Sequence, residues 1–128
     1  MINWNGSFID IAVRGAIAAR LGGMKRAQVS KLLEVAWSAK ESELFEELSL
    51  YIARQISRRE FDRDAARYLI MGLNELKKQN KLSREEVARF IGLFRWAYDS
   101  MEGIRLRVRR EHIRNMTFDG FLKEIGLL

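Results

Sequence analysis

Arginine is the residue type through which this chain could do chemistry, and it gathers in two stretches. The 128-residue sequence carries 23 lysine and arginine residues, of which 16 are arginine. A guanidinium group is planar, stays charged and pairs with phosphate in a bidentate way. The first arginine stretch, residues 53–67, reads ARQISRREFDRDAAR, and the second, residues 105–114, follows Ile104 in the run IRLRVRRE. We therefore take these side chains as candidate phosphate contacts: Arg54, Arg58, Arg59, Arg63, Arg67, Arg105, Arg107, Arg109, Arg110 and Arg114.

The spacing in the first arginine stretch predicts a basic stripe on one helix. Arg59, Arg63 and Arg67 follow one another at intervals of four residues, which gives a stripe about 12 Å long at 1.5 Å rise per residue. Such a stripe could meet successive phosphates of an extended single strand. The alternative is a salt-bridged, solvated helix face, because three acids interrupt the stretch: Glu60, Asp62 and Asp64.

The second arginine stretch has five arginines and one acid, Glu111, so little of its charge is neutralised locally. As a strand, its apolar and basic residues would point to opposite faces. Nothing else in the chain alternates with period two, and an unpaired strand leaves backbone groups unsatisfied. Arginine, leucine and glutamate favour helix, so we predict a helix and leave the strand open. Either geometry places four or five arginines in solvent.

Signals for catalysis or for a metal are weak. The sequence has no cysteine and a single histidine, His112, beside three arginines, and it has no glycine-rich phosphate loop, metalloprotease or hydrolase motif. Acids also cluster at Glu43, Glu46 and Glu47, where they predict an acidic face that could meet a basic face on a neighbouring copy. We expect a protein that is not an enzyme and uses no cofactor.

Composition agrees with one basic globular domain over residues 1–128. The apolar share is 48% and the formal net charge is +6, which is typical of a folded chain with an anionic partner, nucleic acid above all. A stable surface of arginine and glutamate networks is the other interpretation. No run reaches the roughly 20 apolar residues of a membrane span, and no signal peptide is recognisable. We expect a cytoplasmic location.

Hydrophobic periodicity predicts helices throughout. Ser7 would start the first helix, and Gly22–Gly23 would end it. Ser42 would end the second helix or cap the third. Ser57, with Glu60 three residues later, would start a helix that runs to about residue 80. Ser83 would start the next, which ends near Gly103, and Thr117 would cap a short last one. The fold class expected is all-α: a compact bundle of five or six helices joined by short turns.

Apolar stripes predict the core. The first helix is apolar nearly all round, which indicates burial, partly against another subunit. Trp37 and Trp96 are expected in or beside the core rather than as base-stacking platforms, whereas Trp4 is expected near solvent. The later helices would face inward with Phe61, Ala65, Leu69, Leu73, Leu76, Val87, Phe90, Ile91, Phe94, Ala97, Tyr98 and Met101.

Two sequence segments resemble a known family. LYIARQISRREF (50–61) and ARFIGLFRWAYDS (88–100) are similar to the small helical subunit of type III CRISPR effector complexes, with a match over about residues 30–100. The resemblance implies a non-catalytic subunit that lies along the guide–target duplex and contacts its backbone without reading sequence. It would place Tyr51, Ala53 and Arg54 on the first motif, and Phe90, Phe94, Ala97 and Tyr98 on the second.

The sequence thus predicts a non-catalytic subunit of a ribonucleoprotein assembly that binds RNA or another single strand without sequence preference. Its partners would be the phosphate backbone and other protein subunits, and a homodimer or filament-like stacking stays open. A helical assembly protein that docks acidic partners is the alternative. A helix-turn-helix regulator ranks lower, because residues 84–96 are too apolar for a recognition helix.

Overall fold

The computed structural model describes residues 8–128 and shows an all-α fold, as the sequence predicts. No strand occurs in this part of the chain. Two short 3₁₀ segments, η1 (Glu41–Glu43) and η2 (Arg110–Asn115), accompany the α-helices. The six α-helices are α1 (Phe8–Leu21), α2 (Arg26–Ser38), α3 (Leu44–Ser57), α4 (Arg63–Lys78), α5 (Arg84–Ser100) and α6 (Phe118–Glu124).

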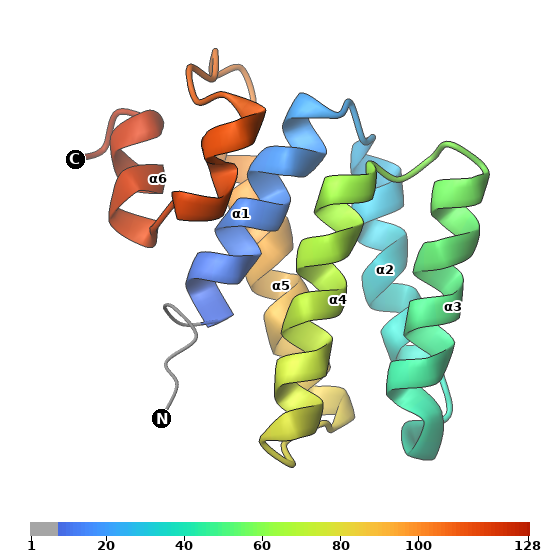
Figure 1. Cartoon of the computed structure of the whole chain (residues 1–128). Coiled ribbons are helices and arrows are strands. Elements are labelled where there is room, and N and C mark those ends of the chain that lie inside the picture. Colours follow the sequence, from blue (N-terminus) through green and yellow to red (C-terminus); the bar gives the residue numbers. More distant parts are fainter. Residues whose placement is uncertain (1–7) are drawn as a thin grey trace.

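Helix α1 is the centre of the molecule. It packs mainly on α4 and α5, while α2 lies against α5 and α3 against α4 (Figure 1). The segment η2–α6 covers α1 on the side away from α2 and α3. Residues 11–19 of α1 are all buried, so the predicted burial is confirmed. Because helices of the same chain supply it, this burial needs no second subunit.

Close approach at the centre depends on one glycine of α1. A Cβ atom at Gly15 would lie 3.2 Å from Cβ of Tyr68 on α4 and 3.3 Å from the ring of Phe94 on α5. Nearby, the buried Arg14 donates from Nε to the carbonyl of Met116 (2.8 Å), and Asp10 accepts the amide of Phe118 (2.8 Å). These two bonds fasten the start of α6 to α1.

Polar caps start three of the helices. Ser83 accepts the amide of Glu86 at the start of α5, and Thr117 accepts the amide of Gly120 at the start of α6, both as predicted. At α4 the prediction is wrong, because the cap is Asp62, which accepts the amide of Ala65 (3.1 Å). Ser42 caps nothing and lies inside η1. The predicted cap Ser7 and the side chain of Trp4 lie outside the residues described.

Ser57 is the last residue of α3, because the chain makes a Schellman turn directly after it. Arg59 has a positive φ of 62°, its amide donates to the carbonyl of Ile56, and the Glu60 amide donates to the carbonyl of Gln55. Phe61 is buried behind the turn. Glycine usually takes the left-handed position of such a turn, so an arginine there hides the turn from sequence reading.

The predicted inward faces of α4 and α5 are correct, whereas two tryptophans are not where we expected them. Every residue of that predicted set, from Phe61 to Met101, is buried. Trp37 and Trp96 are 53% and 72% exposed. Each lies beside a buried alanine, Ala36 or Ala97, and one residue turns the side chain by about 100° around a helix. That rotation places both indoles outside the inward face.

Candidate nucleic-acid interface

The first part of the second arginine stretch is neither the predicted helix nor the alternative strand. Residues 104–109 have no regular secondary structure, and only residues 110–115 form a helix, the 3₁₀ segment η2. The helix prediction is therefore wrong for Arg105, Arg107 and Arg109. Two backbone amides of this segment bond to a side chain rather than to another strand or to a helical carbonyl. Oε2 of Glu124 accepts the amides of Arg107 and Val108. The half-buried Leu106 and Val108 pack against the core and hold the segment down.

The predicted stripe on one helix is also interrupted. Arg59 lies in the turn before α4, so only Arg63 and Arg67 share that helix. Arg54 is in the last turn of α3, and Arg58 is its C-cap. Arg59 instead lines a hollow of about 240 Å³ together with Lys25, at the start of α2. Sequence reasoning missed Lys25, since no spacing rule connects it with residue 59.

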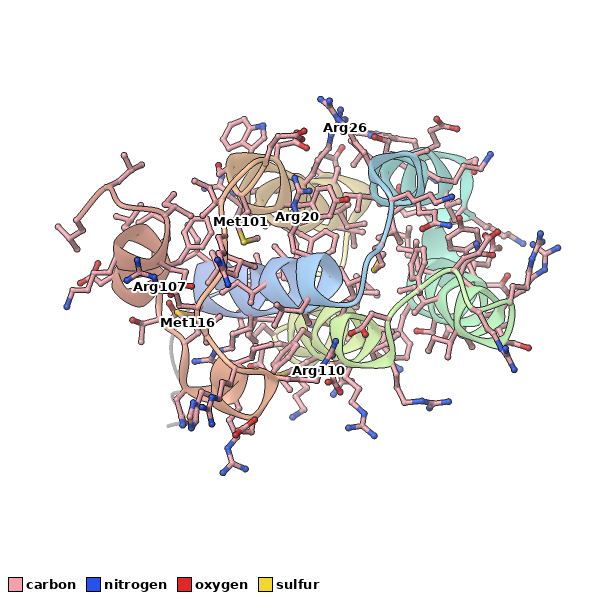
Figure 2. The ribbon with its side chains drawn as sticks, turned by 90° about the horizontal axis from the view of Figure 1, so that it is seen from above. Arg20, Arg26, Met101, Arg107, Arg110 and Met116 are labelled. Atoms are coloured by element: carbon pink, nitrogen blue, oxygen red, sulfur yellow. The ribbon has the colours of Figure 1, made fainter. Side chains whose placement is uncertain are left out.

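The structure brings the two arginine stretches together. Arg67 from α4 and both Arg110 and Arg114 from η2 line one open hollow of about 520 Å³, which we call the Tyr68 hollow. Tyr68 and Ile113 form its apolar wall, and Asp64 and Glu111 are its acids. Figure 2 shows Arg110 beside the first turns of α4, whereas Arg107 lies on the side of α6. Two segments more than 40 residues apart in the chain thus share one surface.

Two acids join these stretches. Nη1 of Arg110 lies 2.8 Å from Asp64 and 3.1 Å from Asp62, and these hydrogen bonds raise the pKa of Arg110 further above its usual value. Asp64 also lies 3.8 Å from Arg67. The acids therefore neutralise part of the arginine charge, as the alternative interpretation held. The arginine that they mainly neutralise is Arg110, which belongs to the second arginine stretch and is distant in the sequence.

Most of the remaining arginines are unpaired and in solvent. Within residues 8–128, no carboxylate oxygen lies within 4.0 Å of the guanidinium nitrogens of eight of the ten candidates, all of them exposed. Their guanidinium groups can reach a phosphate without first breaking an ion pair. The eight are Arg54, Arg58, Arg59, Arg63, Arg105, Arg107, Arg109 and Arg114.

A second hollow opens on the other side of Arg67. It measures about 310 Å³ and is lined by Arg63, Arg67, Ile70 and Met71 of α4, with Ile56 of α3. We call it the Met71 hollow. The sequence held a signal for it, because Ile70 and Met71 are apolar but lie off the inward stripe of α4. Met71 is 45% exposed.

Tyr68 is half-buried between the arginines. Burial raises the pKa of its hydroxyl above the ordinary value of 10.0, and Asp64 adds to the rise, while Arg14 and Arg114 oppose it. No hydrogen bond to the hydroxyl is formed by any residue of 8–128. A ligand in the hollow could therefore meet both the ring and the hydroxyl.

The two segments that carry the family resemblance differ in how deeply their motif residues are buried. The residues of the second motif, Phe90, Phe94, Ala97 and Tyr98, are all buried. Tyr51 of the first motif contacts the Phe61 ring edge-on, with ring centroids 6.0 Å apart. The four residues of the second motif are therefore core residues, whereas Arg54 of the first motif is exposed.

Other chemistry is sparse in the part of the chain that the structure describes. His112 is exposed, and residues 8–128 hold no group of three histidine, cysteine, aspartate or glutamate side chains arranged for a metal ion. None of the helices there has the length and apolarity that crossing a bilayer requires. No protein-family model, curated protein or solved structure matches the chain.

Proposed function

We propose that this chain is a non-catalytic subunit that binds RNA or another single-stranded nucleic acid through the phosphate backbone, without reading its sequence. The observation that carries the proposal is the meeting of the two arginine stretches at the Tyr68 hollow. Phosphate contacts give affinity and position but carry no sequence information. An arginine surface without a recognition helix fits that kind of binding.

The burial of α5 argues against a helix-turn-helix regulator. Phe90, Ile91 and Phe94 all face the core, and the first turn of the helix, the end at which a recognition helix contacts base edges, carries the acids Glu85 and Glu86. Arginines in turns and at helix ends suit a flexible strand better, because such a strand can follow an irregular surface.

A more specific role rests on the family resemblance. We propose that the assembly is a type III CRISPR effector complex, in which this chain would be the small helical subunit. The all-α fold and the exposed, unpaired Arg54 agree with that role. Reconstitution with the other subunits of such a complex tests it, and failure to join the complex would count against this role alone.

The first experiment is a salt titration of a fluorescent single-stranded RNA of about 30 nucleotides. Log affinity should fall linearly with log salt, with a slope near −0.7 for each phosphate contact. About five contacts would give a slope of roughly −3 to −4. The combined variant Arg63→Gln, Arg67→Gln and Arg114→Gln should make the slope shallower by about 2.

The matched control removes three charges from the opposite end of the bundle. Lys77, Lys78 and Lys81 are exposed and lie at and after the end of α4, so their conversion to glutamine lowers the net charge equally. The control should leave the slope nearly unchanged. An equal effect of both variants, or no binding at about 50 mM salt, would contradict the proposal.

The alternative, an assembly protein that docks acidic partners, has one observation in its favour. Trp96 is 72% exposed and lines a hollow of about 400 Å³ with Arg89, Gly92 and Leu93 on α5. Exposed tryptophan and arginine are typical of protein interfaces. Binding of polyglutamate in preference to RNA, with loss of that binding in Trp96→Ala, would support this alternative.

A further inference from the structure

Arg67 stands on a ridge of α4 between two hollows and lines both. The Tyr68 hollow, on one flank, has a volume of about 520 Å³, and the Met71 hollow, on the other, about 310 Å³. Successive residues of an α-helix are turned by about 100°, so Tyr68 falls on one side of Arg67 and Ile70 on the other. The side chain of Arg67 is 71% exposed on the ridge between them.

The lining of the Met71 hollow is mostly apolar, whereas five of the seven residues that line the Tyr68 hollow are charged. Each has an apolar wall, built from Tyr68 and Ile113 in one and from Ile56, Ile70 and Met71 in the other, with arginine at its rim. Small-molecule sites in proteins have volumes of roughly 300–1,000 Å³ with a few polar groups on an apolar lining. Each hollow is therefore large enough for a nucleobase, with an apolar surface for its face.

The acids decide which part of a nucleotide enters the Tyr68 hollow. Asp64 is already paired with Arg110 at 2.8 Å, so Glu111 is the acid of this hollow that has no ion pair within residues 8–128. Its carboxylate would repel a phosphate placed inside the hollow and can accept hydrogen bonds from the amino groups of a base. Arg67 and Arg114 stand at the same hollow, and the ion pair of Arg67 with Asp64, at 3.8 Å, is solvent-exposed and weak. The wall of Tyr68 and Ile113, together with Glu111, thus favours a base inside the hollow, with its phosphate on the exposed Arg67 and Arg114.

We propose that the two hollows take the bases of two neighbouring nucleotides of one strand, and that the phosphate between them binds Arg67. This inference rests on the proposed binding of a single strand, not on the more specific CRISPR role, and deepens it, since it names the ligand as unpaired and locally unstacked. The bases of a duplex are paired and stacked inside it, so they cannot enter either hollow.

The test compares single-stranded RNA with an RNA duplex of the same length, and compares three variants. Tyr68→Leu keeps an apolar wall but removes the aromatic face, so the affinity for the single strand should fall on the order of tenfold. The salt slope should not change, because no phosphate contact is lost. Arg67→Gln should make the slope shallower by about 0.7. Leu50→Ala, at an exposed site on α3, should change neither.

The outcomes separate this inference from the proposed function. Preference for the single strand, together with loss of affinity in Tyr68→Leu at an unchanged slope and an unchanged melting temperature, would support both. Equal binding of duplex and single strand with an inert Tyr68→Leu would overturn the two-base site, whereas the arginine variants would still show backbone binding. If Arg67→Gln also leaves the slope unchanged while polyglutamate competes with RNA, both proposals fail.

Discussion

Arg110 connects the two arginine stretches through the acids at the start of α4. In the sequence it is one of five arginines in a poorly neutralised run. In the structure its guanidinium bridges Asp62 and Asp64 at the start of α4, so its first role is to hold the second arginine stretch against the first. Asp62 and Asp64 neutralise much of its charge. The exposed Arg63 and Arg114, which have no such ion pair within residues 8–128, are better placed to bind a phosphate.

Tyr68 provides a test of the hollow that needs no ligand. Because burial raises the pKa of its hydroxyl above 10.0, ionisation of Tyr68 should have its midpoint above pH 10. Its contribution to folding stability is then fully present below the unfolded pKa of about 10 and is lost as the pH rises through the folded pKa. The measurement is the tyrosinate absorbance of the native protein minus that of Tyr68→Phe.

The same difference titration in a denaturant is the control, and its midpoint should return to about 10. A native midpoint at or below that value would mean that burial of Tyr68 does not outweigh the charges of Arg14 and Arg114, and it would contradict the half-buried position argued for the ring.

At the scale of elements, the crossing of α4 and α5 depends on Gly72. A Cβ atom there would collide with the ring of Phe90, so Gly72→Ala should force the two helices or the ring to shift. Overpacking of this kind costs about 1–3 kcal/mol, and the better helix propensity of alanine offsets about 1 kcal/mol of it. Chemical denaturation should therefore show a net loss of up to about 2 kcal/mol.

Gly92 is the matched control, because it lies inside α5 and a Cβ atom there would meet nothing within 4 Å. Gly92→Ala should raise the free energy of unfolding by up to about 1 kcal/mol. If both variants change stability in the same direction, the close approach at Gly72 does not limit the packing of α4 on α5.

At the scale of the whole molecule, α1 is buried by helices of its own chain, so the fold should be stable without a second subunit. Its buried residues are covered by α4, α5, η2 and α6, and Arg20 ties its end to α5 through the carbonyl and the ring of Tyr98. The melting temperature should therefore stay constant when the protein concentration is varied about a hundredfold. A melting temperature that rises with concentration would show that the stability of the fold depends on association, as the sequence alone suggested for this helix.

The sequence by itself determined the all-α class, the caps at Ser83 and Thr117 and the inward faces of α4 and α5. These follow from local rules, since the period of 3.6 residues and the cap residues act over a few positions of the chain. All ten candidate arginines are exposed, as expected from the rarity of fully buried, unpaired arginine.

Only the tertiary structure decided how those arginines are arranged. The turn at Arg59 separates it from Arg63 and Arg67. Glu124 accepts the amides of Arg107 and Val108, which lie 17 and 16 residues before it in the chain, where the path is irregular. Asp62 and Asp64 find their partner in Arg110, 46 residues or more away. Pairings over such distances depend on which helices pack side by side, and no local pattern encodes them. For that reason the sequence predicted the chemistry of the surface, whereas the hollows on either side of Arg67 were visible only in the fold.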